Sequence, residues 1–154
     1  MRRAARELTS ARDLPSAGVL AAQLGRACSR CHEAQTAVVT FAWEPAPDDA
    51  PALVTQMKRH QWAAARLWEG LVGPSDELWR QGATALSTMR LDTVAASGGT
   101  SRGDVPALAA RVRELAIRAT TLTEQDGRAS LYGELLSTCA GCHTLVRPAA
   151  VPDP

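Results

Sequence analysis

The feature that most constrains this chain is the placement of its four cysteines. All of them lie in two pentads of the pattern C-x-x-C-H, which also contain two of the three histidines. Residues i, i+3 and i+4 share one face of an α-helix, so each pentad presents two thiols and an imidazole to the same side. This is the pattern of a c-type haem attachment site. We therefore expect two haem c groups, bound at Cys28, Cys31 and His32 and at Cys139, Cys142 and His143.

Other uses of paired cysteines fit the pattern less well. A thioredoxin-like redox motif needs a βαβ context, and no alternating pattern of β-branched residues is found in the sequence. Two C-x-x-C pairs that hold a structural zinc usually lie closer together in the chain. Neither a zinc site nor a pair of disulfides explains a histidine directly after each pair.

Length and composition predict one small globular domain over residues 1–154. The chain has 154 residues, of which 45% are hydrophobic and only 4% aromatic, so it has enough apolar material for a core. A formal net charge of +1 gives no reason to expect nucleic acid or an anionic membrane surface as a partner. No apolar run approaches the about 20 residues that a membrane span requires.

Covalent haem attachment also predicts a compartment. In bacteria haem c is attached outside the cytoplasm, so we expect an exported, periplasmic protein. Residues 1–7 are basic, but no apolar stretch of a signal peptide follows them. The sequence is therefore interpreted as a mature chain from which the signal peptide is missing.

Apolar periodicity predicts an all-α fold. Helices are expected over residues 15–42, from about 51 to 73, from 104 onward and from about 128 to 146, and a shorter one from 76 to about 91. In the first helix the expected buried face carries Leu20, Leu24, Cys28 and Cys31. The prediction is an antiparallel four-helix bundle over about residues 14–147, with residues 76–91 in a long second-to-third connection. The proline-rich tail from 148 to 154 is expected to be flexible.

The sequence around the second pentad resembles a known family. Residues 135–147, Leu-Leu-Ser-Thr-Cys-Ala-Gly-Cys-His-Thr-Leu-Val-Arg, resemble the C-terminal helix of class II c-type cytochromes, the cytochrome c′ group. Arg147 matches the basic residue that follows the motif in that family, whereas Val146 stands where an aromatic residue is common. The resemblance implies a four-helix bundle, and because relatives often dimerise, it leaves a homodimer open. The first pentad has no counterpart there, so the chain resembles a dihaem variation on that bundle.

The third histidine, His60, lies on the apolar face of the expected second helix. If the first two helices form a hairpin that turns near Ala46, His32 and His60 stand about equally far from the turn and at similar height. We therefore expect His60 to be the sixth ligand of the haem attached at Cys28 and Cys31. The alternative is a buried neutral histidine with a backbone partner.

Three histidines cannot fill four axial positions, so the second haem is expected to differ from the first. His143 is its expected proximal ligand, and the distal ligand is Met89, Met57 or absent. A bis-histidine first haem would then have the lower potential, since methionine ligation raises it. Arginines close to the pentads are candidates to pair with the haem propionates, namely Arg26, Arg30 and Arg147.

These features predict an electron-transfer protein that works with redox partner proteins and is not an enzyme. The alternative is a gas-binding or sensing haem protein, which needs one open iron. A dihaem peroxidase-like enzyme would also need an open iron with acid–base groups nearby, and every histidine is already assigned.

Overall fold

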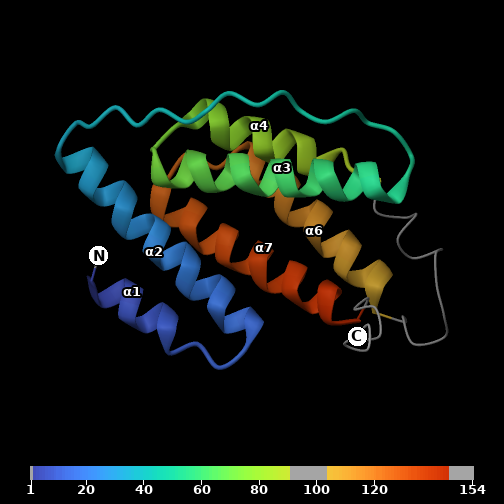
Figure 1. The fold of residues 1–154 in the computed structure, drawn as a ribbon, viewed down its shortest axis with the longest axis horizontal. Helices are drawn as coiled ribbons and strands as arrows, with labels where there is room; N and C mark the ends of the chain where they lie inside the picture. The colour runs from blue at the N-terminus through green and yellow to red at the C-terminus, as the bar shows by residue number, and fades with distance from the viewer. Residues whose placement is uncertain (1, 91–103, 146–154) are drawn as a thin grey trace, which may run out of the picture.

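The computed structural model describes residues 2–90 and 104–145, and within these residues it contains helices and no strand (Figure 1). The all-α prediction is confirmed for this part of the chain. Its helices are α1 (Arg2–Thr9), α2 (Leu14–Ala34), α3 (Leu53–Val72), α4 (Asp76–Ser87), α6 (Val105–Thr120) and α7 (Gln125–Leu145).

The hydrophobic core lies among α3, α4, α6 and α7, which differs from the predicted layout. The segment expected to be a connection, α4, is a core helix, because Trp79 and Leu86 are both 1% exposed. The expected first helix, α2, packs on the outside of α7 and contributes one hydrophobic residue, Ala22, to the core. The other large core residues are Leu67, Leu71, Met89, Val105, Val112, Leu115, Leu131, Tyr132 and Leu135.

Neighbouring core helices run antiparallel, as predicted. The α3–α4 hairpin turns at residues 73–75, and the N-cap Ser75 accepts a hydrogen bond from the backbone N–H of Leu78. Between α4 and α6, Trp79 Nε1 donates to the Ala119 carbonyl over 2.9 Å. Between α3 and α7, the Tyr132 hydroxyl donates to the Ala64 carbonyl over 3.3 Å.

Helix α2 packs antiparallel to α7 through small residues. Its buried positions are Gly18, Ala22, Gly25 and Ser29, and not the predicted face of leucines and cysteines. A Cβ added at Gly18 would lie 2.8 Å from Leu136 Cβ, which shows how closely the two backbones approach. The predicted face is wrong because the contact of α2 with α7 is made by glycine, alanine and serine, whereas the prediction assumed that large apolar residues make it.

Helix α2 ends at Ala34, eight residues before its predicted end. The next residues include the β-branched run Thr36, Val38, Val39 and Thr40, which disfavours a helix. Residues 35–52 instead form an extended connection that runs back along α3 (Figure 1).

Hydrogen bonds from the N-terminal half of α3 hold this connection. Trp62 Nε1 donates to the Glu44 carbonyl over 3.1 Å, Arg59 Nη1 donates to the Pro47 carbonyl over 3.0 Å, and Gln56 Nε2 donates to the Ala50 carbonyl over 2.6 Å. The connection thus returns to the N-terminal end of α3 before that helix begins. The predicted hairpin of the first two helices is therefore wrong: both α2 and α3 run antiparallel to α7, and so parallel to each other.

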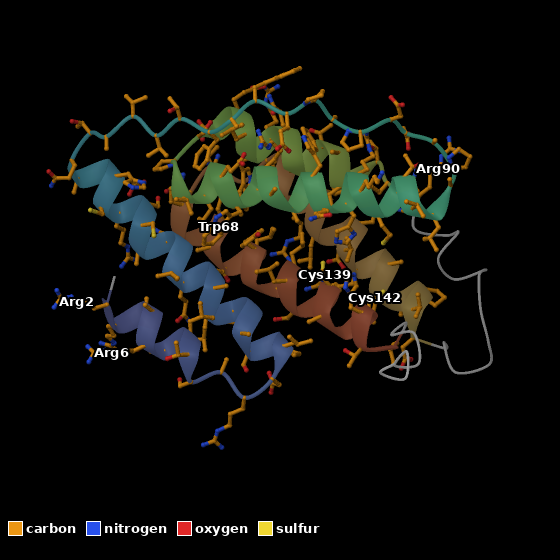
Figure 2. The ribbon with its side chains drawn as sticks, viewed as in Figure 1. Arg2, Arg6, Trp68, Arg90, Cys139 and Cys142 are labelled. Carbon is orange, nitrogen blue, oxygen red and sulfur yellow. The ribbon has the colours of Figure 1, made fainter. Side chains whose placement is uncertain are left out.

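The N-terminal helix α1 was not predicted, because its sequence is dominated by arginine and has no apolar stripe. It packs on α2 and has no buried residue. An ion pair over 2.8 Å joins Arg3 to Glu7 one turn later, and Arg2 and Arg6 point away from the bundle in Figure 2. None of the described helices is long and apolar enough to cross a bilayer.

The contact between α3 and α4 leaves no space for a side chain at Gly82. A Cβ there would lie 2.6 Å from the Ala63 carbonyl oxygen and 2.8 Å from the Leu67 nitrogen, both backbone atoms. We expect Gly82→Ala to lower the free energy of unfolding, because overpacking costs about 1–3 kcal/mol and alanine regains only about 1 kcal/mol of helix propensity. Urea unfolding of the purified protein measures this change.

Gly127→Ala is the matched control. Its Cβ would meet only the flexible side chain of Leu122, at 3.0 Å, so no loss of stability is expected. Equal effects of the two substitutions would contradict the backbone contact at Gly82.

Candidate functional site

The first pentad lies on the last two turns of α2, near the C-terminal end of α3. Cys31 is exposed, and Cys28 and His32 are half-buried. The Nδ1 atom of His32 lies 2.8 Å from the carbonyl oxygen of Val72, so this nitrogen carries the proton and donates. Histidines that bind metals usually donate their second ring N–H in this way. The hydrogen bond leaves Nε2 of His32 as the atom with a free lone pair.

Two arginines beside the first pentad connect α2 to the start of α7. Arg26 Nε donates to Asp126 over 2.6 Å, and Arg30 Nη2 donates to the same carboxylate over 3.0 Å. Arg26 also pairs with Glu33 over 3.0 Å. The hydrogen bonds from both guanidinium groups lower the pKa of Asp126. These candidate propionate partners thus have a carboxylate partner within the chain.

The second pentad lies near the C-terminal end of α7, where Figure 2 labels Cys139 and Cys142. Both thiols are half-buried and pack against the hydrophobic core, whereas His143 is exposed. A histidine from α3 faces them: His60 Nε2 lies 3.4 Å from Cys139 Sγ. The ring centroids of His60 and His143 are 6.3 Å apart, with an angle of 44° between the ring planes. Two imidazoles and two thiols therefore meet at this end of the bundle.

This position of His60 corrects the predicted register. His60 was expected at the height of His32, but His32 contacts Val72, twelve residues further along α3. At 1.5 Å per residue, twelve residues correspond to a rise of about 18 Å. The reason is the extended connection, which makes α2 and α3 parallel and places their equivalent ends together. From the sequence alone, His60 was expected beside the first pentad, whereas in the structure it lies beside the second.

Burial determines the protonation of the groups at the second pentad. Burial, and secondarily the nearby charge of His143, lowers the pKa of His60 below its usual value, so His60 is neutral at pH 7. A neutral imidazole is the form that binds a metal. Burial also raises the pKa of the Cys139 thiol to about 12, with a further increase from Cys142. A protonated thiol is a weak nucleophile, so this pair lacks the thiolate of a catalytic cysteine.

The residues of both pentads fit a haem c group. Each pair of cysteines lies on one helix with its histidine one residue later, and His32 has Nε2 free for a metal. At the second pentad, Nδ1 of His60 is buried and has no hydrogen-bond partner in the described part of the chain. The nitrogen that faces the pentad is Nε2, which lies 3.4 Å from Cys139 Sγ and is the atom available to a metal there.

The remaining candidate ligands lie elsewhere or are not described. Met89 follows α4, is 2% exposed within the core, and its backbone nitrogen donates to the Leu86 carbonyl. Met57 is half-buried against the same core. Iron ligation by Met89 stays a prediction, and Arg147 lies outside the described residues.

An aromatic pair lies between the two pentads. Trp68 on α3 and Tyr132 on α7 have ring centroids 6.0 Å apart with an interplanar angle of 33°. A Cβ at Gly25, one turn before Cys28, would lie 2.7 Å from the Trp68 ring, so only glycine leaves room for the indole there. Tyr132 precedes Cys139 by two turns of α7. Along α3, Trp68 therefore lies between the level of Val72, which contacts His32, and that of His60, which contacts Cys139.

Known proteins give no assignment for this arrangement. Comparison of the chain with known protein families, with curated proteins and with solved structures finds no match. In residues 2–90 and 104–145, no group of three or more His, Cys, Asp or Glu side chains is placed to hold a metal ion by itself.

The carboxylate of Asp126 gives a prediction on pH. A carboxylate with a lowered pKa in the folded state stabilises the fold above its unfolded pKa of about 3.9, and this contribution disappears as the pH falls through the folded pKa. We expect Asp126→Asn to lower the melting temperature slightly at pH 7, by a difference that disappears as the pH falls through the lowered pKa of Asp126 in the folded state. Melting curves of both proteins between pH 7 and pH 2.5 measure it.

The exposed Asp48 on the connection provides a control, because Asp48→Asn is expected to leave the melting temperature unchanged throughout. A constant difference between wild type and Asp126→Asn at every pH would show that the ion pairs with Arg26 and Arg30 do not stabilise the fold.

Proposed function

We propose that this chain is a dihaem c-type cytochrome that passes single electrons to and from redox partner proteins. The observation that carries the proposal is the complete use of four cysteines in two C-x-x-C-H pentads, each on its own long helix. Free thiols or disulfides leave the two trailing histidines unexplained, and no group of His, Cys, Asp or Glu in the described part of the chain is placed to hold a zinc ion. The hydrogen bond from His32 to Val72 and the approach of His60 to Cys139 support the same interpretation.

A haem supplies reversible one-electron exchange at its iron. The residues around the pentads suit that use because they are held by packed helices and fixed hydrogen bonds. At the second pentad the thiols rest against the core, and at the first the imidazole is oriented by a backbone carbonyl. A packed interior resists rearrangement, so a change of charge at the iron moves few atoms.

Access for a partner is expected at the first pentad, where Cys31 is exposed on the surface of the bundle. Because haem c is attached outside the cytoplasm in bacteria, a periplasmic location belongs to the proposal. The near-zero net charge of +1 means that partner recognition relies on local surface features and not on the overall field of the protein.

The proposal predicts two covalent haems per chain. Protein produced with a haem c maturation system should give two haems in a pyridine haemochrome assay, and neither should be extracted by acidic acetone. After denaturation and reduction, none of the four cysteines should react with iodoacetamide, because all are thioethers. The double change Cys28→Ala, Cys31→Ala should leave one haem and two unreactive cysteines.

The variant Cys139→Ala, Cys142→Ala is the reciprocal test and should also retain one haem. It should lose more stability, because these thiols pack against the core and those of the first pentad do not. Four reactive thiols in the wild-type protein, or haem that is extracted by acidic acetone, would overturn the proposed function.

A further inference from the structure

We infer that His60 and His143 are the two axial ligands of the haem attached at Cys139 and Cys142. The haem attached at Cys28 and Cys31 is then held by His32 alone. Its iron binds small neutral ligands such as carbon monoxide. This inference rests on the proposed function and assigns the four axial positions. It reverses the arrangement expected from the sequence, in which the first haem was bis-histidine and the second was open or bound to methionine.

The spacing of the two imidazoles at the second pentad supports the first half of the inference. Metal–imidazole nitrogen bonds are about 2 Å long, so two imidazoles on opposite sides of one metal ion have ring centroids about 6 Å apart. The centroids of His60 and His143 are 6.3 Å apart. The Nε2 atom of His60 also faces the pentad, because it contacts Cys139 Sγ at 3.4 Å.

The first pentad is far from every other described candidate ligand. His32 contacts Val72 at the C-terminal end of α3, and His60 and Met57 lie twelve and fifteen residues before Val72. These separations correspond to rises of about 18 Å and about 22 Å along the helix.

Met89 also lies near the N-terminal end of α3. The backbone nitrogen of the next residue, Arg90, lies 3.3 Å from Gln56 Oε1 and donates to it. The chain has only three histidines and three methionines. The methionine not yet considered, Met1, lies outside the described residues. Among the described residues His32 is therefore the one imidazole or thioether at the first pentad.

The surroundings of the first pentad suit an exchangeable ligand. Cys31 is exposed and Cys28 and His32 are half-buried, so solvent reaches this end of α2. An open haem iron in the ferrous state binds neutral diatomic molecules, and an iron with two imidazoles does not without losing one of them. Carbon monoxide is the probe because it binds ferrous haem and changes its absorption spectrum.

The test is a carbon monoxide titration of the reduced dihaem protein, with haem content measured on the same sample. We expect one carbon monoxide per chain in the wild type. The variant Cys28→Ala, Cys31→Ala, which keeps only the second haem, should bind none. His60→Ala should raise the stoichiometry from one to two.

Two further variants separate ligation by His60 from a structural role. His60→Met keeps a ligand on α3, so the stoichiometry should stay at one while the midpoint potential of the second haem rises. Gln61→Ala changes the exposed neighbour of His60 and should alter neither value. Met89→Leu should likewise leave the stoichiometry at one, whereas a rise to two would identify Met89 as the ligand and overturn the assignment of His60.

The possible outcomes distinguish this inference from the proposed function. Fewer than two haems per chain contradicts the proposed function. With two haems present, no binding to the wild type shows that the first iron is closed by another ligand, and two carbon monoxide molecules show that His60 is not bound to the second iron. Binding that persists after loss of Cys28 and Cys31 places the open iron at the second pentad. Each of these last three results overturns the inference.

Discussion

The arrangement of the candidate site depends on the direction in which the chain returns after α2. An extended segment of residues 35–52 runs along α3 and is held by hydrogen bonds from Trp62, Arg59 and Gln56. This return makes α2 parallel to α3, so the C-terminal ends of both helices lie together. His32 consequently meets Val72, and His60 is left to face α7. With a tight turn in place of the extended segment, the same helices would bring His60 to the first pentad.

The two pentads have the same sequence pattern but different surroundings. At the first, an exposed Cys31 and a half-buried His32 lie beside the ion pairs of Asp126 with Arg26 and Arg30. At the second, the thiols pack against the core and burial raises the pKa of Cys139 to about 12. Burial and solvent exposure are, together with the axial ligands, among the factors that set the potential of a haem iron. Two haems at these positions would therefore differ even with identical pentads.

The sequence predicted the type of each long element well, because helical periodicity and caps are local signals. Both ends of α3 and the start of α4 follow from Pro51, Gly73 and Ser75, whereas α4 ends at Ser87, about four residues before its predicted end. The sequence did not predict the packing partner of α2, since its contact face consists of glycine, alanine and serine. It also missed the extended connection, although the β-branched residues after Ala34 are a signal that was available. The pairing of His60 with Cys139 depends on that connection, and no local pattern contains it.

The position of His60 carries an energetic argument of its own. A buried polar atom that has lost its hydrogen bond to water costs about 1–3 kcal/mol, and Nδ1 of His60 is such an atom in the described part of the chain. A leucine or methionine at this place on α3 would fill similar space against the core without that cost. An imidazole there is therefore unfavourable for packing alone, and the iron bond through Nε2 that we propose would oppose this cost. The same reasoning does not apply to His32, whose Nδ1 already donates to Val72. The cost therefore falls on the one histidine outside the two pentads, and the proposed ligation at the second pentad would give that histidine a role which packing does not.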